Sequence, residues 1–291
     1  MIKKPDYIIC GHLNFSPILF LVNYFIKIPY SISIYGIEMI PNVSNIIKKC
    51  ILNANIIITI SNYTKDLIIK QAPEIKSRIF LLKSSVNKDH FKQKRQNKIL
   101  MNKYNLFNKN IILTLARLSN NEEKGQHRIL QALPEVLKKF PNTIYLIVGG
   151  GNDRRVDEIL HSNPKLKEKV IMTGKIENDD KVDFYNLADV FVMPSKNEGF
   201  GIVFIEALAC GVPVISSDGY GCREGLLNGE IGLLVNPNKK KEIADAIKLF
   251  LDKKVNPNLL NKKNIRRLTI KEYGMERWDN DINFFLQKIK K

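Results

Sequence analysis

Two glutamates, Glu198 and Glu206, lie eight positions apart across a glycine-containing turn, and their types and spacing are suited to holding a charged ligand. Gly199 and Gly201 permit positive φ and let backbone amides approach a ligand closely. Free amides at the start of a helix bind anions such as a diphosphate. A carboxylate one turn into that helix, as at Glu206, can accept two hydrogen bonds from a vicinal diol such as a ribose.

The apolar pattern around this turn predicts the elements that must position it. Residues 189–193 are typical of a buried parallel strand, residues 202–210 of a short helix and residues 212–216 of the next strand. Both glutamates would then lie at the carboxyl edge of a sheet, where open α/β folds bind ligands. From spacing alone, an ordinary strand-turn-helix unit with one capping and one exposed glutamate is an equally good interpretation.

Strands and helices alternate along the rest of the chain, which predicts parallel α/β layers. In the first part, strands are predicted at residues 7–10, 31–35, 56–60 and 79–82, with helices near 17–25, 44–52 and 64–70. In the second part, strands are predicted at residues 111–116, 143–148, 170–172, 190–193, 212–216 and 232–235. The polar, basic stretch 87–110 between them predicts a linker between two domains.

The segment 194–216 resembles the Glu-x7-Glu signature of the retaining glycosyltransferases of family 4, which have the GT-B fold of two Rossmann-like domains facing a cleft. Other blocks resemble the family in the same order, over about residues 110–250. They are Leu115-Ala116-Arg117-Leu118-Ser119, Glu123-Lys124-Gly125, residues 144–151 and residues 232–237. The resemblance implies a partial acceptor-side domain at residues 1–95, a nucleotide-sugar-binding domain at 96–268, and a C-terminal helix at 269–291 that crosses back toward the first domain.

The resemblance also implies a role for each candidate residue in binding a nucleotide-diphosphate sugar. The donor phosphates would be bound by Arg117, Lys124, Gly199, Phe200 and Gly201. Glu206 would bind the ribose, and Glu198 would be the catalytic residue that contacts the donor sugar. The backbone around Lys175 and Ile176 is a weaker candidate for the base pocket. Cationic side chains suit this site, because a diphosphate leaving group gains negative charge as the sugar bond breaks.

The sequence predicts no metal site and no cofactor. Its four histidines and four cysteines show no ligand spacing, and the single Asp-x-Asp, Asp279 to Asp281, lies in a predicted exposed helix face. The resemblance therefore implies metal-independent transfer with retained anomeric configuration. Few, scattered cysteines also suit a reducing compartment, so we expect a cytoplasmic protein.

The formal net charge of +17 raises the question of a nucleic-acid partner. The lysines are spread along the chain, and no zinc finger or basic zipper is present, so we expect no nucleic-acid binding. The charge does predict peripheral contact with anionic lipid at the inner membrane face. No secretory signal is predicted, and the most apolar run, residues 18–26, is too short to span a bilayer and predicts a buried helix.

The resemblance begins late in the first part of the chain. Residues 5–13, 35–38 and 54–61 resemble segments from the middle of the family's N-terminal domain, and only four predicted strands precede the linker. Family members usually begin with further strand-helix units and a glycine-rich loop that faces the acceptor. Tyr35-Gly36 also stands where the family commonly has His-Gly. The N-terminal domain is therefore expected to be incomplete.

Three functions of different classes follow. The first is a glycosyltransferase that transfers a sugar from a nucleotide sugar to a glycan or lipid-linked acceptor, in cell-surface polysaccharide synthesis. The second is a donor-binding subunit or inactive remnant that needs another polypeptide to supply the absent N-terminal units. The third, a nucleic-acid binder, rests on charge alone.

Overall fold

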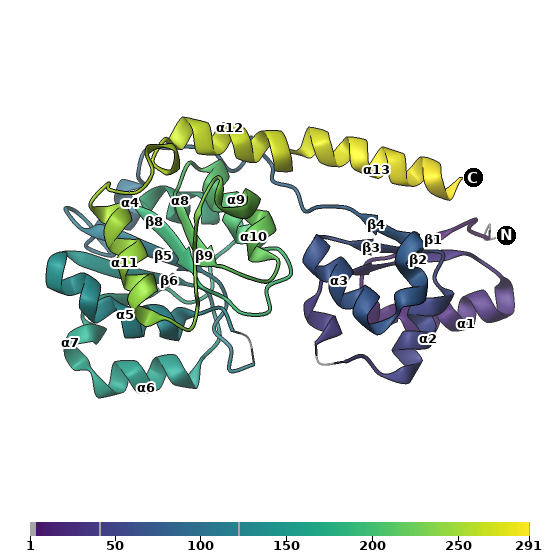
Figure 1. Cartoon of the computed structure of the whole chain (residues 1–291). Helices are drawn as coiled ribbons and strands as arrows, with labels where there is room; N and C mark the ends of the chain where they lie inside the picture. The colour runs from purple at the N-terminus through teal and green to yellow at the C-terminus, as the bar shows by residue number, and fades with distance from the viewer. Residues whose placement is uncertain (1–3, 41, 122, 291) are drawn as a thin grey trace. The chain divides into compact units, whose positions relative to one another are not determined.

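The structure is a computed structural model, and it describes residues 4–40, 42–121 and 123–290. The chain divides into two compact units (Figure 1). The first runs to Ser84 and also includes Asn197–Phe200 and the segment from Glu276 onward; the second comprises Ser85–Lys196 and Gly201–Met275. Each unit is built around one parallel sheet, as the alternating pattern predicts.

The first unit contains a four-stranded parallel sheet in the order β1-β2-β3-β4. Its strands are β1 (Ile8–Cys10), β2 (Tyr30–Ile34), β3 (Ile56–Thr59) and β4 (Ile79–Leu81). Its helices are α1 (Ser16–Ile26), α2 (Asn45–Asn53), α3 (Asn62–Gln71) and α13 (Met275–Ile289). One sheet face packs Ile32 and Ile57 against the helices that connect the strands, and the other packs Ile58 against Phe285 of α13.

The helix predicted at residues 18–26 is present as α1, but the prediction that it is buried is wrong. Ile18, Leu21 and Phe25 are 60%, 54% and 75% exposed. Because α1 carries no charged residue, it is apolar on several sides, whereas the sheet can cover only one. Leu19 packs on that covered side. The sequence showed an apolar helix without showing how much of it would find a neighbour.

The second unit contains a six-stranded parallel sheet in the order β10-β9-β8-β5-β6-β7. Its strands are β5 (Asn110–Leu115), β6 (Thr143–Val148), β7 (Val170–Met172), β8 (Val190–Met193), β9 (Val214–Ser217) and β10 (Leu233–Val235). Its helices are α4 (Lys98–Lys103), α5 (Gln126–Lys139), α6 (Arg154–Ser162), α7 (Pro164–Lys167), α8 (Lys181–Leu187), α9 (Ile202–Ala209), α10 (Cys222–Gly225), α11 (Lys240–Leu251) and α12 (Lys262–Tyr273).

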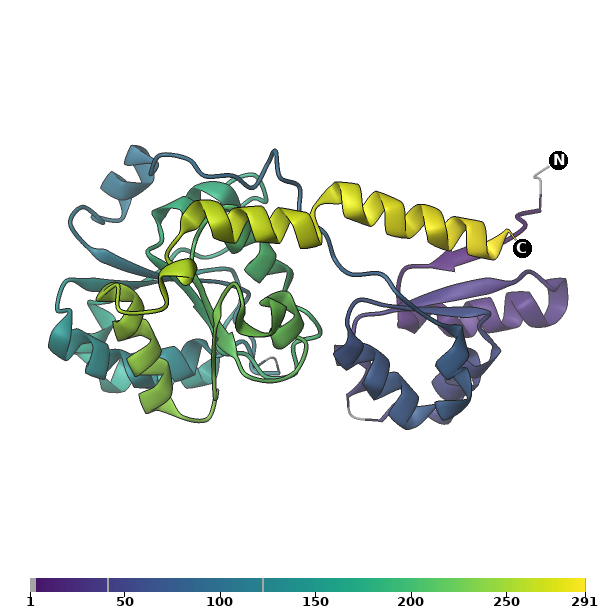
Figure 2. The same cartoon turned by 45° about the horizontal axis from the view of Figure 1, so that its top comes forward.

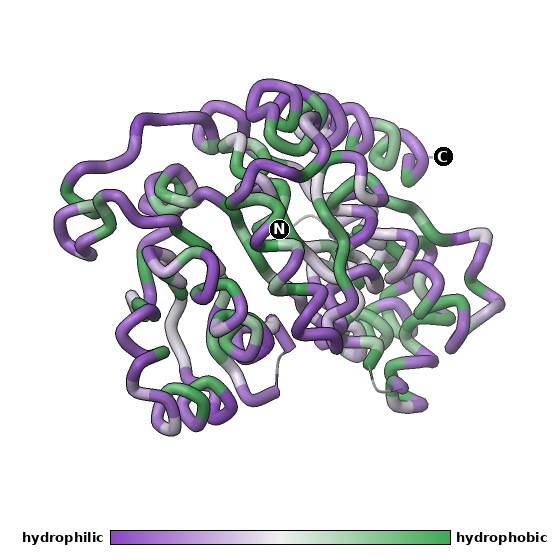
Figure 3. Tube along the Cα trace, turned by 60° about the vertical axis from the view of Figure 1, so that its left-hand side comes forward, coloured by the Kyte–Doolittle hydropathy of each residue, from purple (hydrophilic) through white to green (hydrophobic). Residues whose placement is uncertain are grey.

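Helices cover both faces of this second sheet. On one face α5 lies beside α11 in both views (Figures 1 and 2), and their apolar residues form one core with alternate residues of the strands. On the other face, Tyr185 of α8 and Phe204 of α9 both pack against Phe191 of β8. Strands β6, β8 and β9 are buried at every position, and hydrophobic and hydrophilic stretches alternate along the trace (Figure 3). This pattern is typical of a parallel sheet buried on both faces.

The stretch predicted as a linker, residues 87–110, contains α4 and is held to α8. The backbone N–H of Lys94 donates to Asn186 Oδ1 at 2.7 Å, and Asn97 Nδ2 donates to Asp183 Oδ2 at 2.7 Å. Most of this stretch is therefore fixed to the second unit.

Candidate functional site

The strand order of the second sheet marks where a ligand would bind. β5 is the first strand of this sheet in the chain but lies in its middle, with β6 and β7 on one side and β8, β9 and β10 on the other. The loops that follow β5 and β8 therefore leave the sheet in opposite directions. In open α/β sheets, ligands bind at the carboxyl ends of the strands at such a switch point.

The loop after β5 carries Arg117 and Lys124, and it is fastened to the segment after β8. The backbone N–H of Lys196 donates to the carbonyl oxygen of Glu123 at 2.7 Å. Gly125 has φ +90°, and a Cβ placed there would lie 2.6 Å from the carbonyl oxygen of Pro194. Glycine is thus required where these two segments meet, and Lys124 is held beside the switch point.

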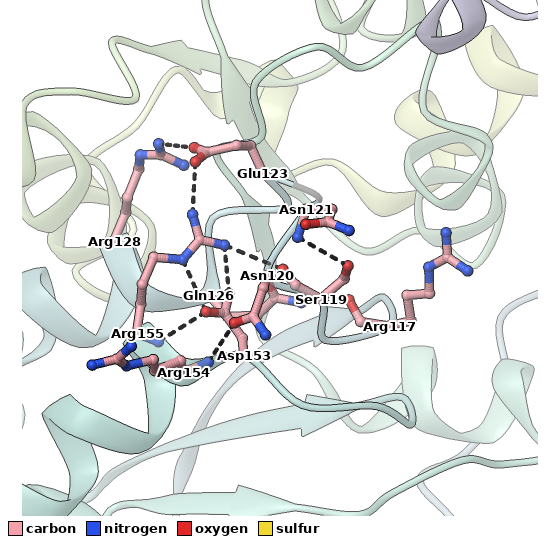
Figure 4. A network of polar contacts seen from close by, with 10 residues as sticks. All are labelled: Arg117, Ser119, Asn120, Asn121, Glu123, Gln126, Arg128, Asp153, Arg154 and Arg155. Carbon is pink, nitrogen blue, oxygen red and sulfur yellow. Dashed lines mark hydrogen bonds and ion pairs between the residues drawn. The ribbon is translucent and has the colours of Figure 1, made fainter.

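A network of ion pairs holds the other side of the same loop (Figure 4). Arg155 binds both oxygens of Asp153, and its Nη1 lies 2.6 Å from Oε1 of Glu123. Arg128 binds the second oxygen of Glu123. Partial burial tends to raise the pKa of Glu123, but Arg128 and Arg155 outweigh it, and the pKa lies below its usual value. Every carboxylate oxygen of Glu123 and Asp153 thus has a guanidinium partner.

Arg117 belongs to the loop but not to this network. Its backbone carbonyl accepts a hydrogen bond from Gln126 Nε2 at 3.2 Å, whereas its guanidinium points away from Glu123 and Arg155 (Figure 4). The backbone of Arg117 is therefore fixed to α5, and its side chain is exposed outside the network.

The glycines after β6 bring a third loop against the first. A Cβ on Gly149 would lie 2.2 Å from the carbonyl oxygen of Ala116, and one on Gly151 would lie 2.2 Å from that of Leu118. Gly150 lies beside Lys175, whose Cβ would be 3.3 Å from an added Cβ. The candidate base-pocket residues Lys175 and Ile176 therefore follow a turn that contacts this glycine loop.

Helix α9 begins at Ile202 after the N-cap residue Gly201, which has φ +92°, and no side chain caps its first turn. The helices α2, α3 and α6 begin differently, with the side chains of Ser44, Ser61 and Asp153 as caps. The first turn of α9 carries no acidic residue. The Phe204 amide donates to the carbonyl oxygen of Gly201 at 2.9 Å, and the positive end of the helix dipole lies at this turn.

The residues just before α9 cluster with the first unit. Within that unit, the Ser61 hydroxyl donates to the carbonyl oxygen of Gly199 at 2.6 Å. A Cβ on Gly199 would lie 1.9 Å from the carbonyl oxygen of Tyr35, so only glycine fits there. Phe200 is fully buried, and Glu198 is half-buried. The structure thus assigns the sequence-predicted residues Glu198, Gly199 and Phe200 to one unit and the others to the second.

Glu206 is buried on α9, where sequence reasoning missed its two partners. Its Oε2 accepts a hydrogen bond from Tyr185 Oη at 2.7 Å, and its Oε1 lies 3.4 Å from Lys181 Nζ. Lys181 and Tyr185 are four residues apart on α8, so they share one helix face. That spacing is the only signal in the sequence that could have linked them.

Among residues 4–40, 42–121 and 123–290, no three His, Cys, Asp or Glu side chains gather into a group that could hold a metal ion. In the same ranges, no helix has both the length and the apolar character needed to cross a bilayer.

The family model for glycosyl transferases group 1 matches residues 96–268. The chain belongs to this family. The resemblance found in the sequence is thereby confirmed.

Over 220 residues the chain is 29% identical to the GDP-mannose-dependent alpha-(1-6)-phosphatidylinositol monomannoside mannosyltransferase of Mycolicibacterium smegmatis. This match covers 73% of this chain and 57% of that protein. Over 164 residues it is 32% identical to the capsular polysaccharide biosynthesis glycosyltransferase CapM of Staphylococcus aureus, and this match covers 55% of this chain and 39% of that protein. The match thus spans 57% of the length of the first of these curated relatives and 39% of the second.

Solved structures show the same fold. The crystal structure of Anabaena Alr3699/HepE in complex with UDP and glucose matches with a TM-score of 0.84 and 19% identity, over 97% of this chain and 78% of that chain. Sucrose-phosphate synthase from Thermosynechococcus elongatus matches with a TM-score of 0.82 and 21% identity, over 98% of this chain and 73% of that chain. The prediction of a GT-B fold with two parallel-sheet α/β domains is therefore confirmed.

Proposed function

We propose that this chain is a glycosyltransferase that moves a sugar from a nucleotide-diphosphate sugar to a glycan or lipid-linked acceptor, with retained configuration. The observation that carries the proposal is the cation-bearing loop after β5 at the switch point of the second sheet, in the same unit as the uncapped start of α9. The names of its relatives, a phosphatidylinositol monomannoside mannosyltransferase and a capsular polysaccharide glycosyltransferase, support a role in the cell envelope.

In the proposed mechanism, the donor diphosphate binds to Arg117, Lys124 and the amides of residues 199–201. These groups neutralise the charge that grows on the leaving group, so the reaction needs no metal ion. Glu206 accepts hydrogen bonds from the ribose. Glu198 contacts the donor sugar and orients it as positive charge develops at the anomeric carbon.

The remaining assignments complete this proposal. Residues 96–268 form the donor domain, and residues 269–291 cross back toward the first domain. Residues 1–95 belong to the acceptor side, although the structure groups those from Ser85 onward with the second unit. The backbone at Lys175 and Ile176 borders the base. We place the reaction in the cytoplasm, where the net charge of +17 favours contact with anionic lipid. Retention on phosphatidylglycerol vesicles at low salt but not at high salt would support that contact, and no retention at low salt would contradict it.

A panel of UDP, GDP and ADP sugars tests the main proposal. A ligand present at about a hundred times its dissociation constant stabilises the folded state by about 2.7 kcal/mol, which a thermal-unfolding assay detects. We expect sugars of one base to raise the unfolding temperature and those of the others to do so less. Absence of any shift across the panel would contradict the proposal. For the active donor, NMR of the product reports the anomeric configuration.

A second candidate function is a donor-binding subunit that acts with another polypeptide. The favouring observation is in the first unit, where β1 is an edge strand and α1 exposes apolar side chains such as Leu21 and Phe25. A partner of α/β type could add a strand beside β1 and cover α1 with its own apolar residues. Nucleotide-sugar binding without transfer by the chain alone would favour this candidate, and transfer by the chain alone would exclude it.

Leu21→Glu probes the same surface. It should abolish assembly with such a partner, whereas Ile99→Glu, at a position on α4 that is 77% exposed, should not. If the chain binds vesicles and Leu21→Glu abolishes that binding, α1 contacts lipid and not a polypeptide.

A further inference from the structure

Glu206 is held by two side chains from one neighbouring helix. Tyr185 donates to Oε2 at 2.7 Å, and Lys181 lies 3.4 Å from Oε1. Each oxygen of the carboxylate thus has one protein partner. The side chain of Glu206 is 8% exposed, so its surroundings leave few other partners.

A carboxylate with one partner on each oxygen is prepared for a diol. Each carboxylate oxygen has two lone pairs, so one remains on each after Tyr185 and Lys181 are satisfied. Two vicinal hydroxyls can donate to these two lone pairs together. Without such partners, the terminal torsion of a glutamate is broad, and the two oxygens have no preferred plane.

Tyr185 is itself rigid. It is fully buried, with its ring 6.1 Å from that of Phe91 and 5.8 Å from that of Phe191, measured between centroids. Burial, and then the neighbouring charge of Glu206, raise the pKa of Tyr185 well above its ordinary value, so the phenol stays protonated and keeps donating. Lys181 is less constrained, since 23% of its side chain is exposed.

We infer that Tyr185, and more weakly Lys181, are positioning residues that fix the plane of the Glu206 carboxylate so that it accepts both ribose hydroxyls of the bound nucleotide. This inference rests on the proposed function and deepens it. Neither residue touches the nucleotide; both act through Glu206.

The test compares UDP, GDP and ADP with their 2′-deoxy counterparts by calorimetry. For whichever base binds, wild-type protein should prefer the ribonucleotide. Tyr185→Phe should lower that preference about two- to fivefold, while affinity for the deoxynucleotide, which keeps one of the two hydroxyls, should fall less. Lys181→Gln should lower it about two- to threefold. In Glu206→Gln protein, adding Tyr185→Phe should have little further effect, because the two act together.

Tyr145→Phe is the matched control. Tyr145 is also fully buried in the second unit, and its hydroxyl lies 2.8 Å from Thr114 Oγ1, away from Glu206. The Tyr145→Phe variant should lose stability as Tyr185→Phe does but keep the preference for the ribonucleotide. Equal loss of preference in both variants would reduce Tyr185 to a general structural role and overturn the inference.

The outcomes separate the two proposals. Wild-type protein that binds none of the three diphosphates would overturn the proposed function, and the inference with it. Wild-type protein with a ribose preference that survives in folded Tyr185→Phe would overturn the inference alone. Should Tyr185→Phe not fold, an unchanged preference in Lys181→Gln would overturn it.

Discussion

Two polar clusters of the second unit contrast in the groups that bind their carboxylates. Around Glu123 and Asp153, all four carboxylate oxygens meet guanidinium groups of Arg128 and Arg155. Around Glu206, each oxygen meets one partner, and one of those lies at 3.4 Å. Both clusters lie on segments that carry candidate site residues.

This contrast suggests that the Glu123 and Asp153 cluster holds a loop backbone in place, whereas the Glu206 cluster serves to bind a ligand. In the first cluster, guanidinium groups bind Glu123 and Asp153 and join them to each other, and the effect is to fix the loop that bears Arg117 and Lys124. In the second cluster, a phenol and a more distant ammonium hold a buried carboxylate, and its remaining lone pairs are expensive to leave without a partner. The first cluster should therefore matter most for stability and the second for affinity.

The largest expected effect is on stability. Arg155→Met leaves Asp153, whose side chain is 1% exposed, without its main partner, and we expect a loss of about 3–5 kcal/mol in the free energy of unfolding. Urea denaturation measures it. The control is Arg154→Met, because the Arg154 side chain is 83% exposed and its ion pair with Glu158 should contribute less than about 1 kcal/mol. Similar losses in both variants would show that the network does not hold the loop.

The same network should make the fold sensitive to acid through His127. Burial, followed by the charges of Arg128 and Arg155, lowers the pKa of His127 to about 4 from an ordinary 6.5. Between pH 6.5 and pH 4, His127 therefore binds a proton in the unfolded chain but not in the folded chain. The free energy of unfolding falls as the pH drops through this range, by an amount on the order of 3 kcal/mol. Replacing His127 by Gln should flatten this window, whereas replacing the exposed His161 should not. An unchanged slope in the His127 variant would disprove the effect.

Lys124→Ala tests the ligand side of the comparison. We expect nucleoside diphosphate binding to weaken by about 1.5–3 kcal/mol, the range for a lost hydrogen bond to a charged group. Calorimetry measures the affinity. Lys138→Ala, on the exposed part of α5, removes the same charge and should have no such effect. If affinity is unchanged in the Lys124 variant, the phosphate assignment is wrong.

The smallest effect is expected at Glu206. Glu206→Gln should weaken nucleoside diphosphate binding by about 1 kcal/mol and leave inorganic pyrophosphate binding unaffected, because pyrophosphate has no ribose. Competition between the two ligands in one assay gives both affinities. A loss of the same size for pyrophosphate would contradict the ribose role.

Much of the fold could be read from local pattern. Residues 143–148, 170–172 and 190–193 are strands within the predicted bounds, because short apolar runs between turn residues are decided locally. Of the two turn glycines for which the sequence allowed positive φ, Gly201 has it and Gly199 does not, and Gly199 is needed instead for its close approach to the Tyr35 carbonyl. The switch point could not be predicted from local pattern, because the position of β5 between β6 and β8 depends on pairing between distant strands.

What the sequence by itself determined was the kind of protein: an α/β chain whose glycine turns, cations and paired glutamates match one family. Only the tertiary structure decided which side chains meet. Arg155 reaches Glu123 from 32 residues away, and Tyr185 reaches Glu206 from a different helix. It also decided that α1 is exposed, since burial depends on neighbours that no local pattern contains. Composition and spacing act along the chain, whereas burial, ion pairing and the orientation of a carboxylate arise between segments that only folding brings together.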